Sequence, residues 1–363
     1  MSKKLLIFIP SIEDGGVEKN LYILANYFYK KLGYLEIVTT SFNKKNYFNK
    51  KINFFGPKSK LLLKSGRYLK YLISLFFLIK QIVINRRNLV ILSFQANIFA
   101  IAIAKIFFIK IITRSNSSPS GWSNNLIKNI IFKFLLNRAD CIIVNSKIFK
   151  KQFLTKFNIH TYCIYNPFDK NIVKKKSNAK ISFDFFKKKN LNIISVGRLT
   201  DQKDQMTLIK SFLLIKKSLK PKLLIIGKGL MHEKLSNFIN ENRVKKNVKL
   251  LGYNKNPYPY IKRSDLFILT SKFEGLPNVL IEAQFLKKYI MSTDCPTGPK
   301  EILLSGKAGD LFPIGNFNKL SELINNYDKK KTNKKINLGY KNLNRFDYEK
   351  NCKKYLYIIK KYL

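Results

Sequence analysis

The sequence has 363 residues, 46% of them hydrophobic, and a formal net charge of +48. That apolar fraction excludes an intrinsically disordered chain. A single hydrophobic core rarely grows past roughly 250 to 300 residues, so the length favours two domains.

The first half of the sequence alternates short apolar strands with helical patterns. Gly15 and Gly16 form a turn after the first strand, and apolar residues then recur at helical spacing. Alternating strands and helices indicate a parallel sheet that is covered on both faces. Strands are predicted at residues 4–9, 35–40, 89–94, 110–113 and 141–145, and the helices include residues 68–84 and 125–137.

The second half repeats this alternation after a basic, polar run at residues 170–189, which is interpreted as a linker. Asp347 is a candidate N-cap for a last helix. The prediction is therefore two Rossmann-like α/β domains, residues 1–168 and 169–345, and a C-terminal helix, residues 346–363, that packs towards the first domain. The cleft between the domains is the default ligand site. Strands are predicted at residues 192–196, 222–226, 248–251, 266–270 and 289–292, and helices at residues 205–219, 230–242 and 277–286.

Lysine supplies most of the positive charge and is spread over nearly the whole chain. The charge indicates either a drift of surface positions towards lysine or a footprint for an anionic partner, such as nucleic acid or a lipid surface. Because no RNA-binding or zinc-finger spacing occurs, drift together with an anionic membrane surface is favoured over a specific nucleic acid. A basic nucleic-acid-binding α/β protein is the alternative.

The cysteines and apolar tracts predict a cytoplasmic protein. The four cysteines lie far apart, which argues against a zinc pair or a disulfide framework and indicates a reducing compartment. The N-terminal apolar run is too short for a signal peptide. The longest apolar tract, residues 89–109, is interrupted by Gln95, Asn97 and Lys105, so a strand followed by a helix explains it better than a membrane span.

The most specific stretch, SKFEGLPNVLIEAQ at residues 271–284, follows a predicted strand. Gly275 and Pro277 suit a loop that turns into a helix. Glu274 then lies at the start of the helix and Glu282 inside it, where two carboxylates could bind sugar or ribose hydroxyls while helix amides face an anion. The plainer alternative is a capping carboxylate and a solvated glutamate, but the flanking residues favour function.

This stretch resembles the E-x7-E signature of retaining glycosyltransferases of family 4, which have the GT-B fold. GGVEKNL, SVGRLTDQKDQMTLIKSF, LIIGKG and STDCPTGPKEIL agree with the family in order and spacing. The last segment is similar to that of bacterial N-acetylgalactosaminyl and N-acetylhexosaminyl transferases of glycan assembly. The resemblance implies an acceptor-side N-terminal domain, a nucleotide-sugar-binding C-terminal domain, a UDP-sugar donor and a lipid-linked or oligosaccharide acceptor at the cytoplasmic face of a membrane.

Arg198 and Lys203 lie in the loop between a strand and a helix, where two cations are a plausible clamp for a diphosphate. A solvated basic loop is the alternative, and for Lys203 alone it would be preferred. The resemblance assigns Arg198, Lys203 and Glu274 to catalysis, with Glu274 on the sugar. It also predicts contacts with the donor from Gly15, Gly16, Gly227, Gly252, Asn278, Val279, Leu280, Glu282, Gly298 and Glu301; for Glu301, a simple helix cap is about equally favoured.

On the acceptor side, the chain departs from relatives that place a histidine after a strand of the N-terminal domain. TRSNSS at residues 113–118 offers Arg114 and Asn116 instead. No metal cluster is evident, and such enzymes generally stabilise the leaving diphosphate with cations and helix dipoles, so no metal is expected. A GT-B nucleotide-sugar epimerase is a further alternative, but it would need acid or base residues at the sugar, and His160 and His232 are poorly placed for that role.

Residues 61–87 form an apolar, basic stretch that could lie on an anionic membrane. A helix buried against the sheet is the alternative. The resemblance to enzymes that use lipid-linked acceptors favours the membrane. The basic side chains of this stretch include Lys64, Arg67, Lys70, Lys80, Arg86 and Arg87.

Overall fold

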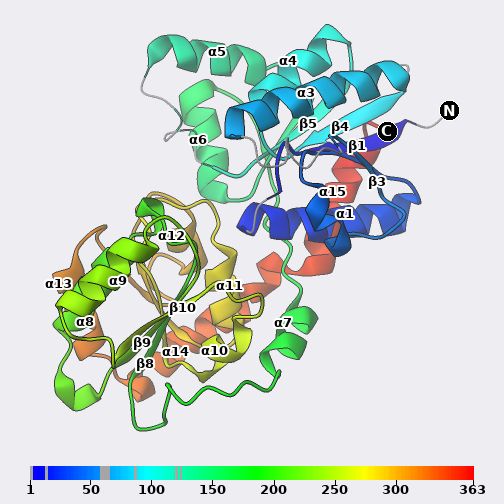
Figure 1. The fold of residues 1–363 in the computed structure, drawn as a ribbon. Helices are drawn as coiled ribbons and strands as arrows, with labels where there is room; N and C mark the ends of the chain where they lie inside the picture. The colour runs from blue at the N-terminus through cyan, green and yellow to red at the C-terminus, as the bar shows by residue number, and fades with distance from the viewer. Residues whose placement is uncertain are drawn as a thin grey trace. The chain divides into compact units, whose positions relative to one another are not determined.

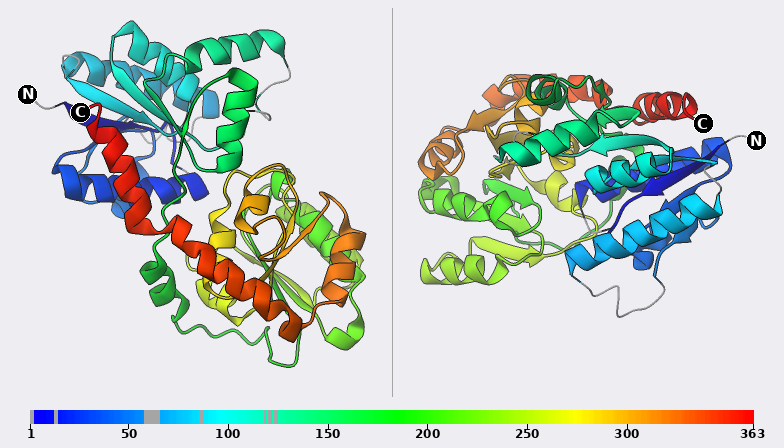
Figure 2. Two further views of the ribbon diagram at one scale, coloured as in Figure 1. Left: turned by 180° about the vertical axis from the view of Figure 1, so that it is seen from behind. Right: turned by 90° about the horizontal axis from the view of Figure 1, so that it is seen from above.

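The structure, a computed structural model, describes residues 3–12, 15–57, 66–85, 88–117, 119, 122 and 125–363, except the side chains at positions 43 and 67 (Figure 1). Its contacts divide the chain into two units, which are described separately (Figure 2). Unit 1 comprises Met1–Pro167 and Tyr348–Leu363, and unit 2 comprises Phe168–Asp347.

Unit 1 is built on a parallel sheet whose described strands follow the order β3-β2-β1-β4-β5-β6-β7. Both faces of such a sheet are covered, so its strands are apolar throughout rather than alternating; in β1, for example, Leu5 to Phe8 are all buried. The strands are β1 (Lys4–Phe8), β2 (Glu36–Val38), β3 (Asn53–Phe55), β4 (Leu89–Ser93), β5 (Lys110–Ser115), β6 (Cys141–Val144) and β7 (Tyr162–Cys163).

The helices of unit 1 cover the two faces of this sheet. α1 (Gly16–Leu32) and α15 (Tyr348–Lys360) pack on the face that contains Leu5 and Ile7. The opposite face, which contains Leu6 and Phe8, is covered by four helices. They are α3 (Arg67–Ile84), α4 (Asn97–Ile106), α5 (Leu126–Leu136) and α6 (Lys147–Phe157), and the 3-10 helix η1 (Phe42–Tyr47) follows β2.

Unit 2 contains a second parallel sheet, with the described strands in the order β10-β9-β8-β11-β12-β13. Its strands are β8 (Asn192–Val196), β9 (Lys222–Ile226), β10 (Val248–Gly252), β11 (Leu266–Leu269), β12 (Tyr289–Thr293) and β13 (Asp310–Phe312). Its helices are α7 (Lys170–Ser177), η3 (Asp201–Lys203), α8 (Gln205–Leu213), η4 (Lys217–Leu219), α9 (His232–Glu241), α10 (Tyr258–Arg263), α11 (Asn278–Phe285), α12 (Gly298–Ile302), α13 (Phe317–Asn325), α14 (Lys329–Lys341) and η5 (Asn342–Phe346). The prediction of two Rossmann-like parallel-sheet domains is confirmed.

The stretch predicted as a linker, residues 170–189, is a helix in its first part. The Asp169 carboxylate accepts hydrogen bonds from the amides of Asn171 and Ile172, which caps α7. Val173 and Ser177 are buried on its inner side. The linker prediction was therefore wrong for residues 170–177, because two buried positions and one cap suffice for a short, lysine-rich helix.

Candidate functional site

The two strands that position the predicted site residues, β8 and β11, are neighbours in the sheet of unit 2 although about 70 residues separate them. The strand order reverses between them, since β9 and β10 lie beyond β8 and β12 and β13 beyond β11. At such a switch point the loops that follow the two strands diverge and leave room for a ligand at the carboxyl ends. Arg198 and Lys203 follow β8, and Glu274 follows β11.

A salt bridge joins the two loops. The Lys203 ammonium contacts the Glu274 carboxylate, and both side chains are largely buried, with 14% and 7% of their surface exposed. Ser271 donates a hydrogen bond to the same carboxylate oxygen at 2.7 Å. Sequence reasoning assigned Lys203 and Glu274 separately to the donor, and the structure brings their side chains into contact.

The backbone of both loops is held by polar side chains. The side-chain amide of Gln205 donates to the Arg198 carbonyl at 2.9 Å, and the Thr270 hydroxyl donates to the Lys203 carbonyl at 3.0 Å. The Thr297 hydroxyl donates to the Glu274 carbonyl. Arg198 itself has an exposed side chain. Ser271 and Thr297 were not predicted as site residues, although both lie in the motif segments SKFEGLPNVLIEAQ and STDCPTGPKEIL.

Cys295 is fully buried beside this salt bridge. Burial and the negative charge of Glu274 together raise the pKa of its thiol to about 12. Cys295 is therefore a neutral thiol near neutral pH and adds no charge to the site.

Two of the predicted donor-binding glycines allow close packing of backbone around the switch point. A Cβ on Gly227 would lie 1.8 Å from the Gly197 carbonyl oxygen, and one on Gly298 would lie 1.9 Å from the Gly275 oxygen. Both contacts are far shorter than any real Cβ contact, so only glycine fits at these positions. Gly252, at the end of β10, has a φ of 79° and needs glycine for its conformation.

The remaining donor-side residues lie on α11 and α12. Asn278 and Val279 form the first turn of α11 and are half-buried, whereas Leu280 is buried. Glu282 lies deeper in the same helix and is only 6% exposed. Glu301 is half-buried in the first turn of α12. The two carboxylates of the E-x7-E pattern thus occupy different surroundings, one in a loop and one on a buried helix face.

In unit 1, Gly15 is the N-cap of α1 and Gly16 its first residue. The first turn of α1 also carries Glu18, which is only 5% exposed. Its carboxylate accepts a hydrogen bond from the side-chain amide of Gln95, which lies two residues after the end of β4. These residues lie at the carboxyl ends of β1 and β4, where the strand order of this sheet reverses. Glu18 belongs to the segment GGVEKNL and was not predicted as a site residue.

Arg114 lies inside β5 rather than after it, and its side chain is fully buried. Its guanidinium donates to the Tyr355 hydroxyl at 2.9 Å, to the Asn166 side chain at 2.7 Å and to the Asn116 side chain. Arg114 is therefore an internal link between β5 and α15, and an acceptor cannot reach it in this arrangement. Asn116, which is half-buried, stays the predicted acceptor-side residue.

The helix predicted at residues 68–84, within the apolar, basic stretch at residues 61–87, corresponds to α3. Lys64, Arg86 and Arg87 lie outside the described residues, and so does the side chain of Arg67. Within α3, Lys80 is exposed and Lys70 half-buried. None of the helices in the described ranges is long and apolar enough to cross a membrane.

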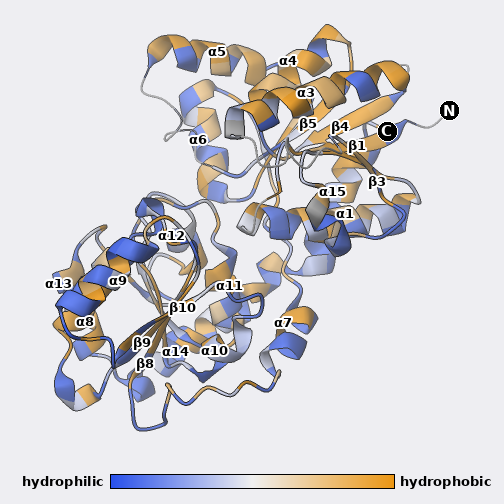
Figure 3. Cartoon of the chain, in the orientation of Figure 1, coloured by the Kyte–Doolittle hydropathy of each residue, from blue (hydrophilic) through white to orange (hydrophobic). Residues whose placement is uncertain are grey.

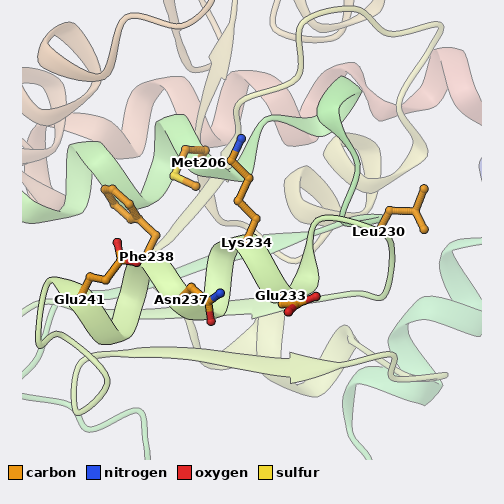
Figure 4. Close-up of a pocket in the computed structure, with 7 residues that line it drawn as sticks. All are labelled: Met206, Leu230, Glu233, Lys234, Asn237, Phe238 and Glu241. Carbon is orange, nitrogen blue, oxygen red and sulfur yellow. The ribbon is translucent and has the colours of Figure 1, made fainter.

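A groove of about 490 Å³ lies beside α9, and neither Lys203 nor Glu274 lines it. Figure 4 shows its lining, which is Met206, Leu230, Glu233, Lys234, Asn237, Phe238 and Glu241. A smaller hollow of about 160 Å³ adjoins it and reaches Thr200 and Asp201 of the loop after β8. The groove contains none of the predicted site residues. Among the residues described, no group of three or more His, Cys, Asp or Glu side chains could hold a metal ion.

The chain is similar to known glycosyltransferases in sequence. Residues 177–351 match the family model "Glycosyl transferases group 1". An uncharacterized glycosyltransferase of Methanocaldococcus jannaschii is 37% identical over 198 residues, covering 52% of this chain and 48% of the relative. The N-acetylgalactosamine-N,N'-diacetylbacillosaminyl-diphospho-undecaprenol 4-alpha-N-acetylgalactosaminyltransferase of Campylobacter jejuni is 31% identical over 200 residues, covering 54% of this chain and 53% of the relative. The matches therefore span about half the length of these relatives.

The fold matches over nearly the full length. The crystal structure of Anabaena HepE in complex with UDP and glucose has a TM-score of 0.79 at 20% identity, covering 99% of this chain and 100% of that one. This likeness confirms the GT-B architecture predicted from the sequence. Residues 177–351, which include nearly all of unit 2, are thus similar to the glycosyl transferases group 1 family.

Proposed function

We propose that this protein is a retaining hexosyltransferase of family 4. It would move an N-acetylhexosamine from a UDP-sugar to a lipid-linked glycan in bacterial polysaccharide, lipopolysaccharide or glycoprotein-glycan biosynthesis. The observation that carries the proposal is the salt bridge between Lys203 and Glu274, which joins the two loops at the switch point of unit 2. Arg198 lies in the same loop as Lys203. The HepE complex with UDP and glucose and the name of the Campylobacter relative support the choice of donor and acceptor.

The reaction would depend on charge. As the bond between the anomeric carbon and the diphosphate oxygen breaks, negative charge grows on the diphosphate. Arg198, Lys203 and the N-terminus of α11 would stabilise that charge most when it is largest, at the transition state. The Lys203 ammonium has three N–H donors, so its contact with Glu274 leaves capacity for a phosphate oxygen. No bound metal is required in this scheme, and no side chain of the protein is proposed as a nucleophile.

The two glutamates would have separate tasks. Glu274 would bind hydroxyl groups of the donor sugar, because its carboxylate is fixed by Lys203 and Ser271 next to the diphosphate site. Glu282 would bind the ribose from α11. Gly15, Gly16 and Asn116 of unit 1 would face the donor phosphates and the acceptor, and the acceptor would be reached from the cytoplasmic face of the membrane.

The first experiment measures melting temperature with a panel of nucleotide sugars, because a bound ligand stabilises the folded state by mass action. UDP-N-acetylhexosamines should raise the melting temperature more than other nucleotide sugars at the same concentration. If no nucleotide sugar raised it, the proposed function would be wrong.

The second experiment measures transfer by variants of the clamp. Arg198→Ala and Lys203→Ala should each lose about 2 to 4 kcal/mol of transition-state stabilisation, a loss of roughly 30-fold to 1,000-fold in kcat/KM. Lys272→Ala is the matched control, since Lys272 lies two residues before Glu274 but pairs with Asp201 at an exposed edge. Full activity in a folded Arg198 or Lys203 variant would remove that residue from the clamp.

A third experiment separates the glutamates by calorimetry. Glu282→Ala should weaken UDP and UDP-sugar binding alike, whereas Glu274→Ala should weaken binding of the sugar-bearing ligand or turnover. An equal loss of UDP affinity in both variants would contradict the assignment.

A further inference from the structure

The helices that cover one face of the sheet in unit 1 expose many large apolar side chains. More than half of the exposed large apolar side chains found in the described residues lie between Tyr68 and Phe134, on α3, α4, α5 and the turn after α4. Figure 3 shows these three helices as predominantly hydrophobic. Soluble proteins rarely expose apolar side chains in such a contiguous group unless they bind another surface there.

Helix α5 carries the densest part of this group. Its exposed apolar side chains, which we call the α5 face, are Leu126 (78% exposed), Ile127 (69%), Ile130 (67%), Ile131 (48%) and Phe134 (55%). At 100° per residue these five positions fall within one arc of about 140°. The α5 face is therefore a single continuous stripe along the helix.

The opposite side of α5 is anchored in unit 1. The Phe132 ring packs edge-on against Trp122 with ring centroids 5.9 Å apart, and Leu136 is buried in the core. The Asn125 side chain caps the helix by accepting a hydrogen bond from the Lys128 amide. The helix is thus fixed with its apolar stripe outward, and the exposure is a property of the fold.

Positive charge surrounds the stripe. Lys128 and Lys133 lie on its two borders at helical spacing, and both are exposed. The sequence has no Asp or Glu at all between Glu36 and Asp140. Asp140 itself is bound by Lys105 at 2.5 Å and by Lys110 at 3.0 Å. A surface that combines exposed Leu, Ile and Phe with lysines and lacks carboxylates complements an apolar layer beneath anionic headgroups.

The length of α5 decides its orientation. It has 11 residues, so it is about 16 Å long, whereas the hydrocarbon core of a bilayer is about 30 Å thick. The helix cannot span the bilayer and suits a position in the plane of the interface, where lysine chains reach back to the headgroups. Neighbouring α4 extends the apolar surface with Phe99 and Ile106, which are 54% and 69% exposed.

We propose that the α5 face of unit 1 inserts into the headgroup boundary of an anionic phospholipid bilayer and is the main membrane contact of the protein. This goes beyond the stretch at residues 61–87, because it places the contact on a different helix. The biological purpose rests on the proposed function, in which the acceptor is lipid-linked, but the contact itself can be measured without donor or acceptor.

The test is co-sedimentation of the full chain with vesicles. Vesicles of phosphatidylcholine with phosphatidylglycerol should bind the protein, and vesicles of phosphatidylcholine alone should bind it at least tenfold more weakly. The variant Ile127→Gln/Ile130→Gln/Phe134→Gln should lose at least tenfold in binding to the anionic vesicles. Lys128→Gln/Lys133→Gln should lose about tenfold or more and should bind with a smaller salt dependence.

Unit 2 supplies the matched control at the end of α8. Leu213 and Leu214 are exposed there beside the exposed lysines Lys216 and Lys217. Leu213→Gln/Leu214→Gln and Lys216→Gln/Lys217→Gln should leave vesicle binding unchanged. Folding of α5 in each variant is read from the fluorescence of Trp122, the single tryptophan of the chain, because its ring packs on Phe132.

A direct measurement of depth completes the test. Trp122→Phe/Phe134→Trp leaves one indole in the α5 face, and lipids brominated on the acyl chains should quench it in anionic vesicles. Absence of quenching, or unchanged binding of a folded triple glutamine variant, would overturn the proposal. The proposal would also be overturned if the protein formed dimers in a concentration-dependent manner and the triple variant lost this dimerisation but still bound vesicles. In that case the α5 face would bind a second copy of the chain. Vesicle binding without any response to nucleotide sugars would instead contradict the proposed function alone.

Discussion

The salt bridge between Lys203 and Glu274 should contribute measurably to the stability of unit 2. We consider Lys203→Met and Glu274→Gln, singly and together. Methionine keeps most of the aliphatic chain of Lys203. This chain packs near Gly197, since a Cβ built on Gly197 would lie 3.7 Å from the nearest Lys203 carbons. Glutamine keeps an oxygen for the Ser271 hydroxyl, which now donates to Glu274 at 2.7 Å. Each variant thus removes a charge with little change in shape.

The expected magnitude follows from burial. Removing one partner of a fully buried ion pair costs about 3–5 kcal/mol, because the other charge is left without compensation. Here 14% of Lys203 and 7% of Glu274 stay exposed, so water can partly solvate the remaining charge. We therefore expect each single variant to lose about 2–3 kcal/mol of unfolding free energy. The double variant should lose less than the sum, with a coupling energy of about 1–2 kcal/mol.

Hydrogen exchange of the full chain can measure these losses unit by unit. Amides of β8 and β11 report on unit 2, and amides of β1 and β4 in unit 1 provide an internal reference that should not change. If the loss in the double variant equalled the sum of the two single losses to within about 0.5 kcal/mol, the two side chains would be independent and the reasoning would be refuted. Equal losses in both units would indicate a global effect unrelated to the salt bridge.

Two further predictions concern packing and pH. Gly227→Ala should destabilise unit 2 by more than about 1 kcal/mol, because its Cβ would lie 1.8 Å from a backbone oxygen. Gly197→Ala should be tolerated, because its nearest neighbours would be Lys203 carbons, the first at 3.7 Å. Hydrogen exchange measures the loss of unfolding free energy in each variant, and equal losses would contradict the prediction. Burial alone would raise the pKa of Asp140, but hydrogen bonds from Lys105 and the Ile111 amide, together with Lys110, hold that pKa below its ordinary value. Asp140 therefore stabilises unit 1 above about pH 4, and this contribution is lost as the pH falls through its folded-state pKa. Asp140→Asn should reduce the unfolding free energy by about 1–2 kcal/mol at pH 7 and by progressively less towards pH 3. A difference from wild type that stayed constant over this range would exclude the carboxylate charge as the cause.

Strands with long apolar runs were predicted well from the sequence. Residues 192–196 and 222–226 coincide with β8 and β9, because each run is bounded by polar residues and buried on both faces. β3, β7 and β13 were not predicted, since two or three residues are too few for a pattern to be recognised. α14 was missed for another reason: its sequence KKKTNKKINLGYK has few apolar residues, and its start depends on the cap from Asp328.

The candidate site was predicted by residue type but not by contact. Lys203 and Glu274 are 71 positions apart, and their salt bridge exists only because β8 and β11 are neighbours in the sheet. Local patterns contain no information on that adjacency. The same limit explains Arg114, which was predicted to follow a strand on the acceptor side. Its burial depends on Tyr355, which lies 241 positions further along the chain.

The return of α15 to unit 1 has a consequence for the order of folding during synthesis. Domains generally fold from the N-terminus as the ribosome delivers them, but unit 1 needs Tyr355 and Ile359, which are made after every residue of unit 2. Until then one apolar face of the first sheet lacks part of its cover, and the buried Arg114 guanidinium lacks the Tyr355 hydroxyl. All residues of unit 2 are therefore synthesised before unit 1 is complete, and a chain released after Asp347 would contain the whole of unit 2 but only part of unit 1.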